Sequence, residues 1–235
     1  MNKDDYNIHK DHRNRMRAKL KRCGADAFDA YQLIEMLLFH TIPRKDTNPP
    51  AHRLLELYPD GGLLRANEEE MTDVEGVGEK SAALLRLSRD TVLRLICDSL
   101  SKEPMESDFS RRAYLYIWFI SKPAGCVGAM FLDSHDKLLE CSLLSSGRMF
   151  RCENYVDKIT DIARKCGAKK VILCHNHING DKNPSMEDRF LTECISRNLI
   201  EAGLEYLGHY IVTASDCIYC PGCKNGVESE CCTQK

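Results

Sequence analysis

Apolar residues recur at helical spacing through the first part of the chain. In residues 30–40 (AYQLIEMLLFH) and 51–58 (AHRLLELY) they fall three and four positions apart, which indicates amphipathic helices. Prolines, asparagine and charged residues separate these segments at 41–50, so we expect a loop there. Residues 67–96 predict a short helix, a glycine turn and a long helix. The pattern therefore predicts a helical region over residues 9–97.

After residue 110 short apolar runs alternate with helical segments. We expect an amphipathic helix at 111–120, a two-stranded hairpin at 126–144 with its turn at Asp133–Lys137, and a helix at 154–167. Residues 169–175 (KKVILCH) form a continuously apolar run, as in a buried central strand. A helix at 186–203 and a final strand at 204–214 follow. Alternating strands and helices predict a mixed α/β domain.

Together these patterns predict an α+β protein with two domains. The helical domain would comprise residues 1–98 and the mixed α/β domain residues 111–215. Residues 99–110 are polar and contain a proline, so we expect a linker there. Residues 216–235 would form a cysteine-rich C-terminal tail.

Charge and composition narrow the class of protein. A net charge of -2 argues against a uniformly cationic nucleic-acid binder, but it leaves room for a local basic patch. No apolar run approaches the ~18 residues of a membrane span, so we expect no membrane partner. The charged N-terminus lacks the apolar centre of a signal peptide. We therefore expect a cytoplasmic protein in which most of the 13 cysteines stay reduced.

A glycine turn separates the last two predicted helices of the first domain. Gly76 and Gly78 allow positive φ and close approach of another backbone, and amides at the next helix start can bind a phosphate. Lys80 adds positive charge. The turn resembles a helix-hairpin-helix motif, which would place DNA binding in residues 1–98. The other interpretation is a tight turn between packed helices, and the basic segment 9–22 is equally a solvated helix face.

A second group of residues has the spacing of a metal site. His175 and His177 stand two apart at the end of a strand, so both side chains point to the same side. Asp188 arrives from the next helix, for which Ser185 is the predicted N-cap. Two imidazoles and one carboxylate suit Zn²⁺ and leave a coordination position for water. The other interpretation is two surface histidines beside a Ser-x-x-Asp that only caps a helix.

This spacing resembles a known metal signature. His-x-His, seven residues, Ser, two residues, Asp is similar to the signature of the JAMM (MPN+) metallopeptidase fold, and residues 175–188 (HNHINGDKNPSMED) resemble the corresponding block of the RadC family. The resemblance implies a JAMM domain of cytidine-deaminase-like mixed α/β fold, preceded by a helix-hairpin-helix region. It also implies that His175, His177 and Asp188 bind zinc and that Ser185 steadies the oxyanion or the bound water.

The general base that this resemblance implies is missing. JAMM enzymes carry a glutamate where the first strand of the hairpin begins, and here that position is Gly125. Residues 122–132 contain no acidic side chain. Loss of a positioned base costs roughly 10²–10⁴ in rate. Glu140, Glu153 and Glu187 are the candidates for a substitute.

The cysteines near the C-terminus raise a further hypothesis. Cys217, Cys220 and Cys223 have a short spacing that could belong to a second, thiolate-bound metal site. The other interpretation is an ordinary cysteine-rich tail or a redox pair.

Two functional hypotheses follow. The first is a RadC-like zinc metallohydrolase that cleaves an amide or isopeptide-like bond in a protein or peptide, with weak activity because the expected glutamate is absent. The alternative is a DNA-associated, non-catalytic zinc-binding protein linked to DNA repair or genome maintenance. A carboxylate at the base position would favour the hydrolase, and its absence favours the non-catalytic protein.

Overall fold

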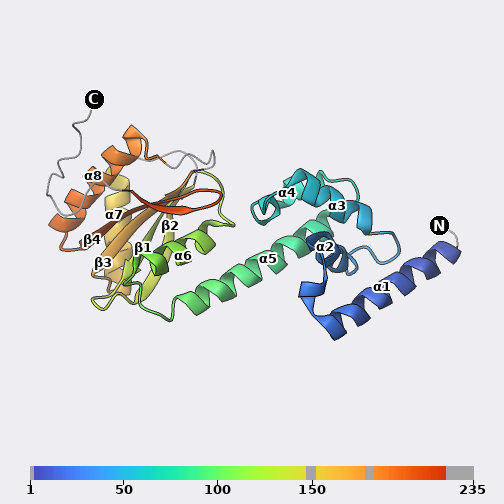
Figure 1. The fold of residues 1–235 in the computed structure, drawn as a ribbon. Helices are drawn as coiled ribbons and strands as arrows, with labels where there is room; N and C mark the ends of the chain where they lie inside the picture. Colours follow the sequence, from blue (N-terminus) through green and yellow to red (C-terminus); the bar gives the residue numbers. More distant parts are fainter. Residues whose placement is uncertain (1–2, 147–151, 178–182, 221–235) are drawn as a thin grey trace, which may run out of the picture. The chain divides into compact units, whose positions relative to one another are not determined.

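The chain divides into two compact units, residues 1–92 and residues 93–235. The computed structural model describes residues 3–146, 152–177 and 183–220 (Figure 1). The long helix α5 (Glu79–Leu100) contributes residues to both units.

The first unit is helical, as the apolar spacing predicts. Its main core joins α2, α3, α4 and the start of α5, with Leu38, Leu54, Met71 and Leu85 among the buried side chains. Capping boxes begin two of the helices, at Asp29 and Asn67. The helices are α1 Lys3–Cys23, α2 Ala30–Leu38, α3 Asn48–Leu57, α4 Glu68–Thr72 and α5 Glu79–Leu100, with short 3-10 turns at Ala25–Ala27 and Gly62–Leu64.

Arg13, in the basic segment 9–22, stabilises the fold of the first unit. The Arg13 side chain is buried and donates hydrogen bonds to the carbonyl oxygens of Ile42 (2.6 Å), Pro43 (2.9 Å) and Lys45 (2.7 Å). These bonds satisfy loop carbonyls and fix the loop at 41–46 against α1. The segment 9–22 is therefore partly buried rather than a uniformly solvated helix face.

The second unit contains a five-stranded sheet in the order β2-β1-β3-β4-β5. β1 pairs antiparallel with β2 and β3, β3 runs parallel to β4, and β4 pairs antiparallel with β5. The predicted hairpin and the predicted central strand are both confirmed. The strands are β1 Cys126–Leu132, β2 Leu138–Ser146, β3 Lys170–Asn176, β4 Glu205–Val212 and β5 Cys217–Cys220.

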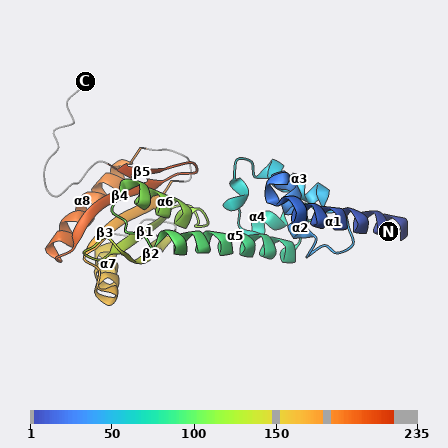
Figure 2. The same cartoon turned by 60° about the horizontal axis from the view of Figure 1, so that its bottom comes forward.

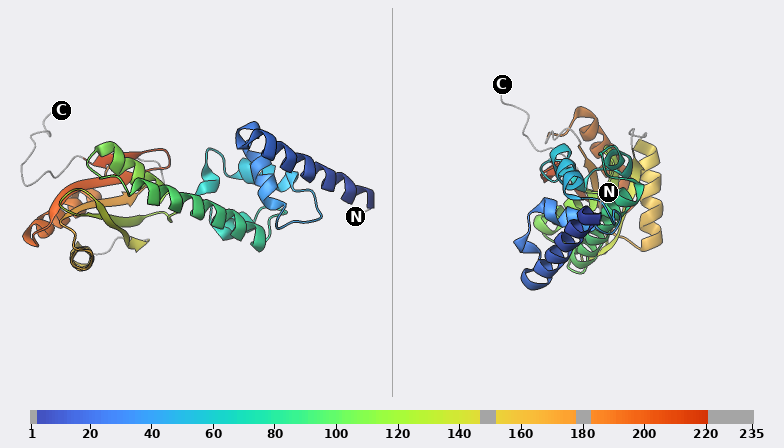
Figure 3. Two further views of the ribbon diagram at one scale, coloured as in Figure 1. Left: turned by 90° about the horizontal axis from the view of Figure 1, so that it is seen from below. Right: turned by 90° about the vertical axis from the view of Figure 1, so that its right-hand side faces the viewer.

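Helices cover both faces of this sheet. α7 (Cys152–Cys166) and α8 (Met186–Glu201) pack on one face, which includes Val171 and Leu173 of β3. α6 (Asp108–Phe119) packs on the other, which includes Ile172 and Cys174. Figures 2 and 3 show α7 and α6 on opposite sides of the sheet. Because both faces of β3 are covered, its sequence is continuously apolar.

A bulge in β4 decides which residues face α8. Val171 pairs with Tyr206 and Ile172 with Gly208, so Leu207 is an extra residue on β4. Gly208 adopts φ +131°, and a Cβ there would overlap the Tyr219 ring. Since side chains alternate along a strand, the extra residue places His209 opposite Leu173 and on the same face as α8.

Two boundaries differ from the expectation. Residues 99–110 include the end of α5 and the start of α6, and Met105 between them is 1% exposed with its N–H bonded to the Asp136 carbonyl. An apolar side chain thus anchors the expected linker to the sheet. The sheet also continues beyond residue 215, because β5 extends it through Cys220.

Within the described part of the chain, no helix combines the length and the apolar composition that crossing a bilayer requires.

Candidate metal centre

Three side chains converge where β3 ends and α8 begins. His175 lies in β3, His177 follows it directly, and Asp188 is in the first turn of α8. The connection from β3 through α8 to the parallel strand β4 places all three at the carboxyl end of β3, where α/β sheets commonly bind ligands. Metal-ligand atoms of these residues all lie within 4.8 Å of one another. The convergence expected from the sequence is therefore present.

Distances within the cluster are short. The Nε2 atoms of His175 and His177 are 2.6 Å apart. Asp188 Oδ1 lies 3.2 Å from His175 Nε2, and Asp188 Oδ2 lies 3.3 Å from His177 Nε2. Tetrahedral zinc with bonds of about 2.1 Å separates its ligand atoms by about 3.4 Å, so the two contacts to the carboxylate match such an ion.

Burial sets the charge of the cluster. Burial lowers the pKa of His175 to about 4, against a smaller opposing effect of Asp188. Burial alone would raise the pKa of Asp188. The hydrogen bonds from Ser185 and the nearby His175 and His177 outweigh this effect, so the pKa of Asp188 lies below its ordinary value. At neutral pH His175 is thus a neutral imidazole and Asp188 a carboxylate, which are the forms that bind a metal.

Ser185 is the N-cap of α8, as predicted. Its hydroxyl accepts a hydrogen bond from the Asp188 N–H (3.0 Å) and donates to Asp188 Oδ2 (2.6 Å). The Ser185 N–H donates to the same carboxylate oxygen (2.8 Å). In this arrangement Ser185 orients the Asp188 carboxylate. Support of an oxyanion or a bound water remains a prediction.

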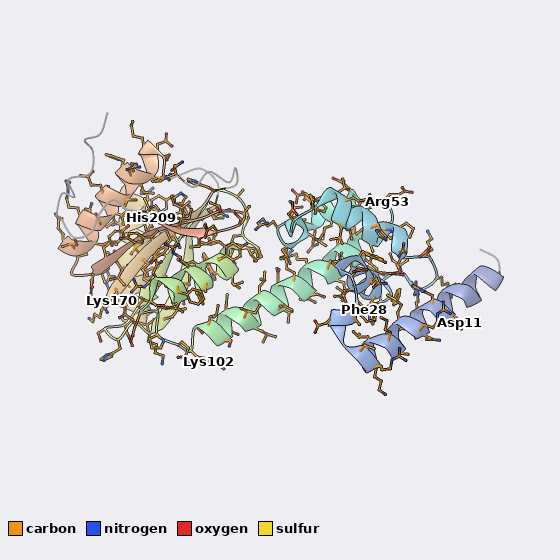
Figure 4. All side chains as sticks on the ribbon, viewed as in Figure 1. Asp11, Phe28, Arg53, Lys102, Lys170 and His209 are labelled. Carbon is orange, nitrogen blue, oxygen red and sulfur yellow. The ribbon has the colours of Figure 1, made fainter. Side chains whose placement is uncertain are left out.

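His209 is a site residue that the sequence reasoning missed. It is 1% exposed, and its Nε2 atom lies 2.7 Å from His175 Nδ1 (Figure 4 labels it within the sheet unit). Its Nδ1 atom lies 2.6 Å from Thr192 Oγ1. Burial, followed by the nearby His175, lowers the pKa of His209 well below its ordinary value. A lone histidine in an apolar strand gives no signal of this contact.

Asn176, between the two histidines, fixes the neighbouring strand. Its Oδ1 accepts the Cys126 N–H (2.7 Å), and its Nδ2 donates to the Pro123 carbonyl (2.8 Å). These bonds hold the backbone on both sides of Gly125, whose φ is +68°. Val127 pairs with His175, so Gly125 lies at the end of β1 that borders the cluster. The expected base position is next to the site and has no side chain.

The structure separates the other candidates for a base. Glu140 is exposed and pairs with Phe131, which pairs with Val171, four residues before His175. At ~3.3 Å per residue, Glu140 is about 13 Å from the cluster along the strands. Glu187 is exposed beside Asp188. The Glu153 side chain lies outside the described residues. Among described side chains, the carboxylate of Asp188 alone joins the cluster.

Cys217 and Cys220 lie on β5, and a second metal site at these cysteines stays a prediction. Both are buried in β5, three residues apart, so their side chains point to opposite faces of the sheet. Among the described residues, the metal-ligand side chains that converge are those of the histidine and aspartate cluster, and no thiolates gather in this way. Cys223 lies outside the described residues. Among the described residues, eight cysteines are free thiols, whereas Cys194 is disulfide-bonded.

The glycine turn lies beside a cleft in the first unit. Gly76 has φ +91°, and a Cβ there would meet Pro50 at 3.2 Å, so the turn needs a glycine. Gly78 precedes α5, and Lys80 is exposed in its first turn. The adjacent cleft of about 1180 Å³ is lined by residues 41–46, 49, 50, 53, 75, 76 and 78–81. The structure thus shows the turn and the cleft, and DNA binding stays a prediction.

Known proteins are similar to this chain. Residues 109–220 match the family of the RadC-like JAB domain. A UPF0758 protein of Rhodobacter capsulatus is 28% identical over 84% of this chain and 93% of its own length. A UPF0758 protein of Fusobacterium nucleatum is 28% identical over 86% of this chain and 91% of its own length. Residues 109–220 are thus similar to the RadC-like JAB domain, and the chain is similar to UPF0758 proteins over most of its length.

Proposed function

We propose that this domain is a zinc-dependent hydrolase centre of the JAMM type, with an amide or isopeptide-like bond of a protein or peptide as its substrate. The observation that carries the proposal is the convergence of His175, His177 and Asp188 at the carboxyl end of β3. When bound, zinc supplies a Lewis acid that polarises a carbonyl and activates water.

The residues of the chain prepare the site for such an ion. The buried His175 ring is neutral at pH 7, so a metal does not have to displace a stabilised proton. The Asp188 carboxylate is held by the hydroxyl and the N–H of Ser185. Asn176 places the start of β1 beside the histidines.

Metal analysis tests the ligand set. We expect one zinc per chain in the wild type and in a variant with Cys223, Cys231 and Cys232 changed to serine. His177→Ala should lose most of that zinc, because it removes a ligand, whereas His135→Ala should keep it because His135 is exposed in the β1–β2 turn. Equal zinc content in the His177→Ala and His135→Ala proteins would refute the ligand set.

Peptide hydrolysis tests the chemistry. We expect slow cleavage of fluorogenic peptide or isopeptide substrates, because the base position is Gly125. The activity should disappear with a chelator and in Asp188→Ala. Zinc binding without any such activity would contradict the hydrolase and favour the second candidate function.

That second candidate is a DNA-associated, non-catalytic zinc-binding protein. The cleft beside the glycine turn supports it, because Arg44, Lys45 and Lys80 line the cleft near the amides that begin α5. Arg53 in the same cleft is already paired with Glu75 (3.0 Å), which weakens its attraction for a phosphate. DNA binding should therefore be weak, independent of sequence and sensitive to salt.

Fluorescence anisotropy with a short DNA duplex at low and high salt tests the second candidate. Lys80→Glu should reduce the affinity, since it reverses a charge at the cleft. Lys102→Glu is the matched control, because Lys102 is exposed outside the first unit. Affinity that is unchanged by salt or by Lys80→Glu would rule out phosphate binding at this turn.

A further inference from the structure

A chain of hydrogen bonds runs from the backbone of one predicted zinc ligand to the ring of another. Thr192 Oγ1 lies 2.6 Å from the Asp188 carbonyl oxygen and 2.6 Å from His209 Nδ1. His209 Nε2 lies 2.7 Å from His175 Nδ1. Thr192 and His209 are 2% and 1% exposed, so water does not supply alternative partners for these groups.

The direction of each bond follows from the Asp188 carbonyl. A carbonyl oxygen only accepts, so the Thr192 hydroxyl must donate its proton there. Thr192 Oγ1 then accepts from His209, which places the His209 proton on Nδ1. A neutral His209 has a lone pair on Nε2, and this atom accepts a proton from His175 Nδ1. His175 Nε2, which faces His177 and Asp188, is left with its lone pair.

The reverse order would block the site. If His209 donated from Nε2, the His175 proton would move to Nε2, and that atom could not bind a metal. A His209 ring protonated on both nitrogens would place a full charge in a buried position, which is costly. When the Thr192 hydroxyl donates to the Asp188 carbonyl, His175 Nε2 carries no proton and His209 stays neutral.

We propose that His209 and Thr192 are positioning residues that hold His175 in the tautomer whose Nε2 is free to bind zinc. The proposal rests on the proposed zinc site, and it assigns a task to two residues outside the ligand set. Groups that orient a metal-bound imidazole typically change metal affinity by roughly 10–100-fold when removed.

Competition titration of zinc against a chromophoric chelator measures the effect. Thr192→Val and His209→Leu should each weaken zinc binding by roughly 10-fold or more, since they break the chain of hydrogen bonds. Thr192→Ser and His209→Gln should stay within about 3-fold of wild type, because a hydroxyl and an amide oxygen can replace the lost groups. Ser196→Ala is the control: Ser196 lies one turn further along α8, and its hydroxyl donates to the Glu193 carbonyl (3.0 Å).

Nitrogen NMR of the histidine rings in the metal-free protein gives a readout that needs no zinc. We expect His175 protonated on Nδ1 in the wild type and in Thr192→Ser, and a shift toward Nε2 protonation in Thr192→Val and His209→Leu. Circular dichroism identifies the variants that fold. If His209→Leu does not fold, Thr192→Val and Thr192→Ser alone test the proposal.

The outcomes separate this proposal from the proposed function. If wild-type zinc binding is insensitive to His177→Ala, the zinc site itself fails. If zinc binding requires His177 while Thr192→Val and His209→Leu bind as tightly as Ser196→Ala, the positioning proposal fails and the zinc site stands. A His175 tautomer that is the same in all folded variants would overturn it as well.

Discussion

Position 125 shows how one residue can keep its place in a site without contributing a side chain. The Asn176 amide bonds the backbone at Pro123 and Cys126, and Gly125 between them has φ +68°. Asparagine and aspartate tolerate this left-handed region better than other residues with a Cβ. A glutamate there, which the RadC resemblance would call for, meets backbone strain of roughly 1–3 kcal/mol.

Aspartate is therefore the better probe of the missing base. Gly125→Asp and Gly125→Asn have nearly the same shape, and only the first adds a carboxylate. We expect Gly125→Asp to hydrolyse a peptide substrate at least about 10-fold faster than Gly125→Asn, because a positioned base contributes roughly 10²–10⁴. Zinc content and melting temperature should be the same for both. Equal rates in the two variants would exclude position 125 as a base position.

A buried thiol should make the second unit sensitive to high pH. Burial, with a smaller effect of Asp98, raises the pKa of Cys97 to about 11. Between pH 9 and 11 the unfolded thiol ionises while the folded one stays protonated, so stability falls as pH rises. Burial also raises the pKa of Cys141, Cys174 and Cys217 in the same unit, so these thiols add to the effect. From pH 8 to pH 10 we therefore expect Cys97→Ala to lose about 1 kcal/mol less stability than wild type. Urea unfolding followed by fluorescence measures it, and Cys23→Ala, at an exposed thiol, should behave like wild type.

At the scale of elements, periodicity predicted most of the fold. The apolar run of β3 and the helical spacing of α7 and α8 follow directly from burial on one or two faces. β5 was missed because its residues, Cys217–Cys220, are too few to show a period. His209 and Thr192 could not be predicted, since their contact depends on parallel pairing of β3 with β4 and on the bulge at Leu207. The metal ligands were predictable because their spacing is local.

The bulge in β4 can be tested by adding one methyl group. Gly208→Ala combines a strained φ of +131° with overlap of the Tyr219 ring, so we expect a loss of roughly 2 kcal/mol or more. Gly203→Ala is the control, because Gly203 has φ +76° and open space around it, and strain alone costs about 1 kcal/mol. Because His209 follows the bulge, zinc affinity should fall in Gly208→Ala and not in Gly203→Ala. Similar losses of stability in both variants would mean that Tyr219 moves aside without cost.

At the scale of the whole molecule, the two units should respond separately to metal. The chain has one tryptophan, Trp118 in α6, so its fluorescence reports the second unit alone. Saturating zinc at about 1,000 times its dissociation constant stabilises a folded domain by about 4 kcal/mol. A chelator should therefore lower the Trp118 unfolding temperature in wild type and leave it unchanged in Asp188→Ala. The unfolding transition of the first unit (residues 1–92), followed by circular dichroism, should have the same midpoint with and without chelator.

The parallel pairing of β3 with β4 also has a consequence for how the protein matures. All three predicted ligands have been synthesised once the chain reaches the start of α8, whereas β4, which carries His209 beside β3, comes only after that helix. A nascent chain that ends within α8 thus has the ligands and lacks the strand that orients them. We expect zinc to bind after β4 has been synthesised and paired with β3. The ion would then stabilise a folded domain rather than direct its folding.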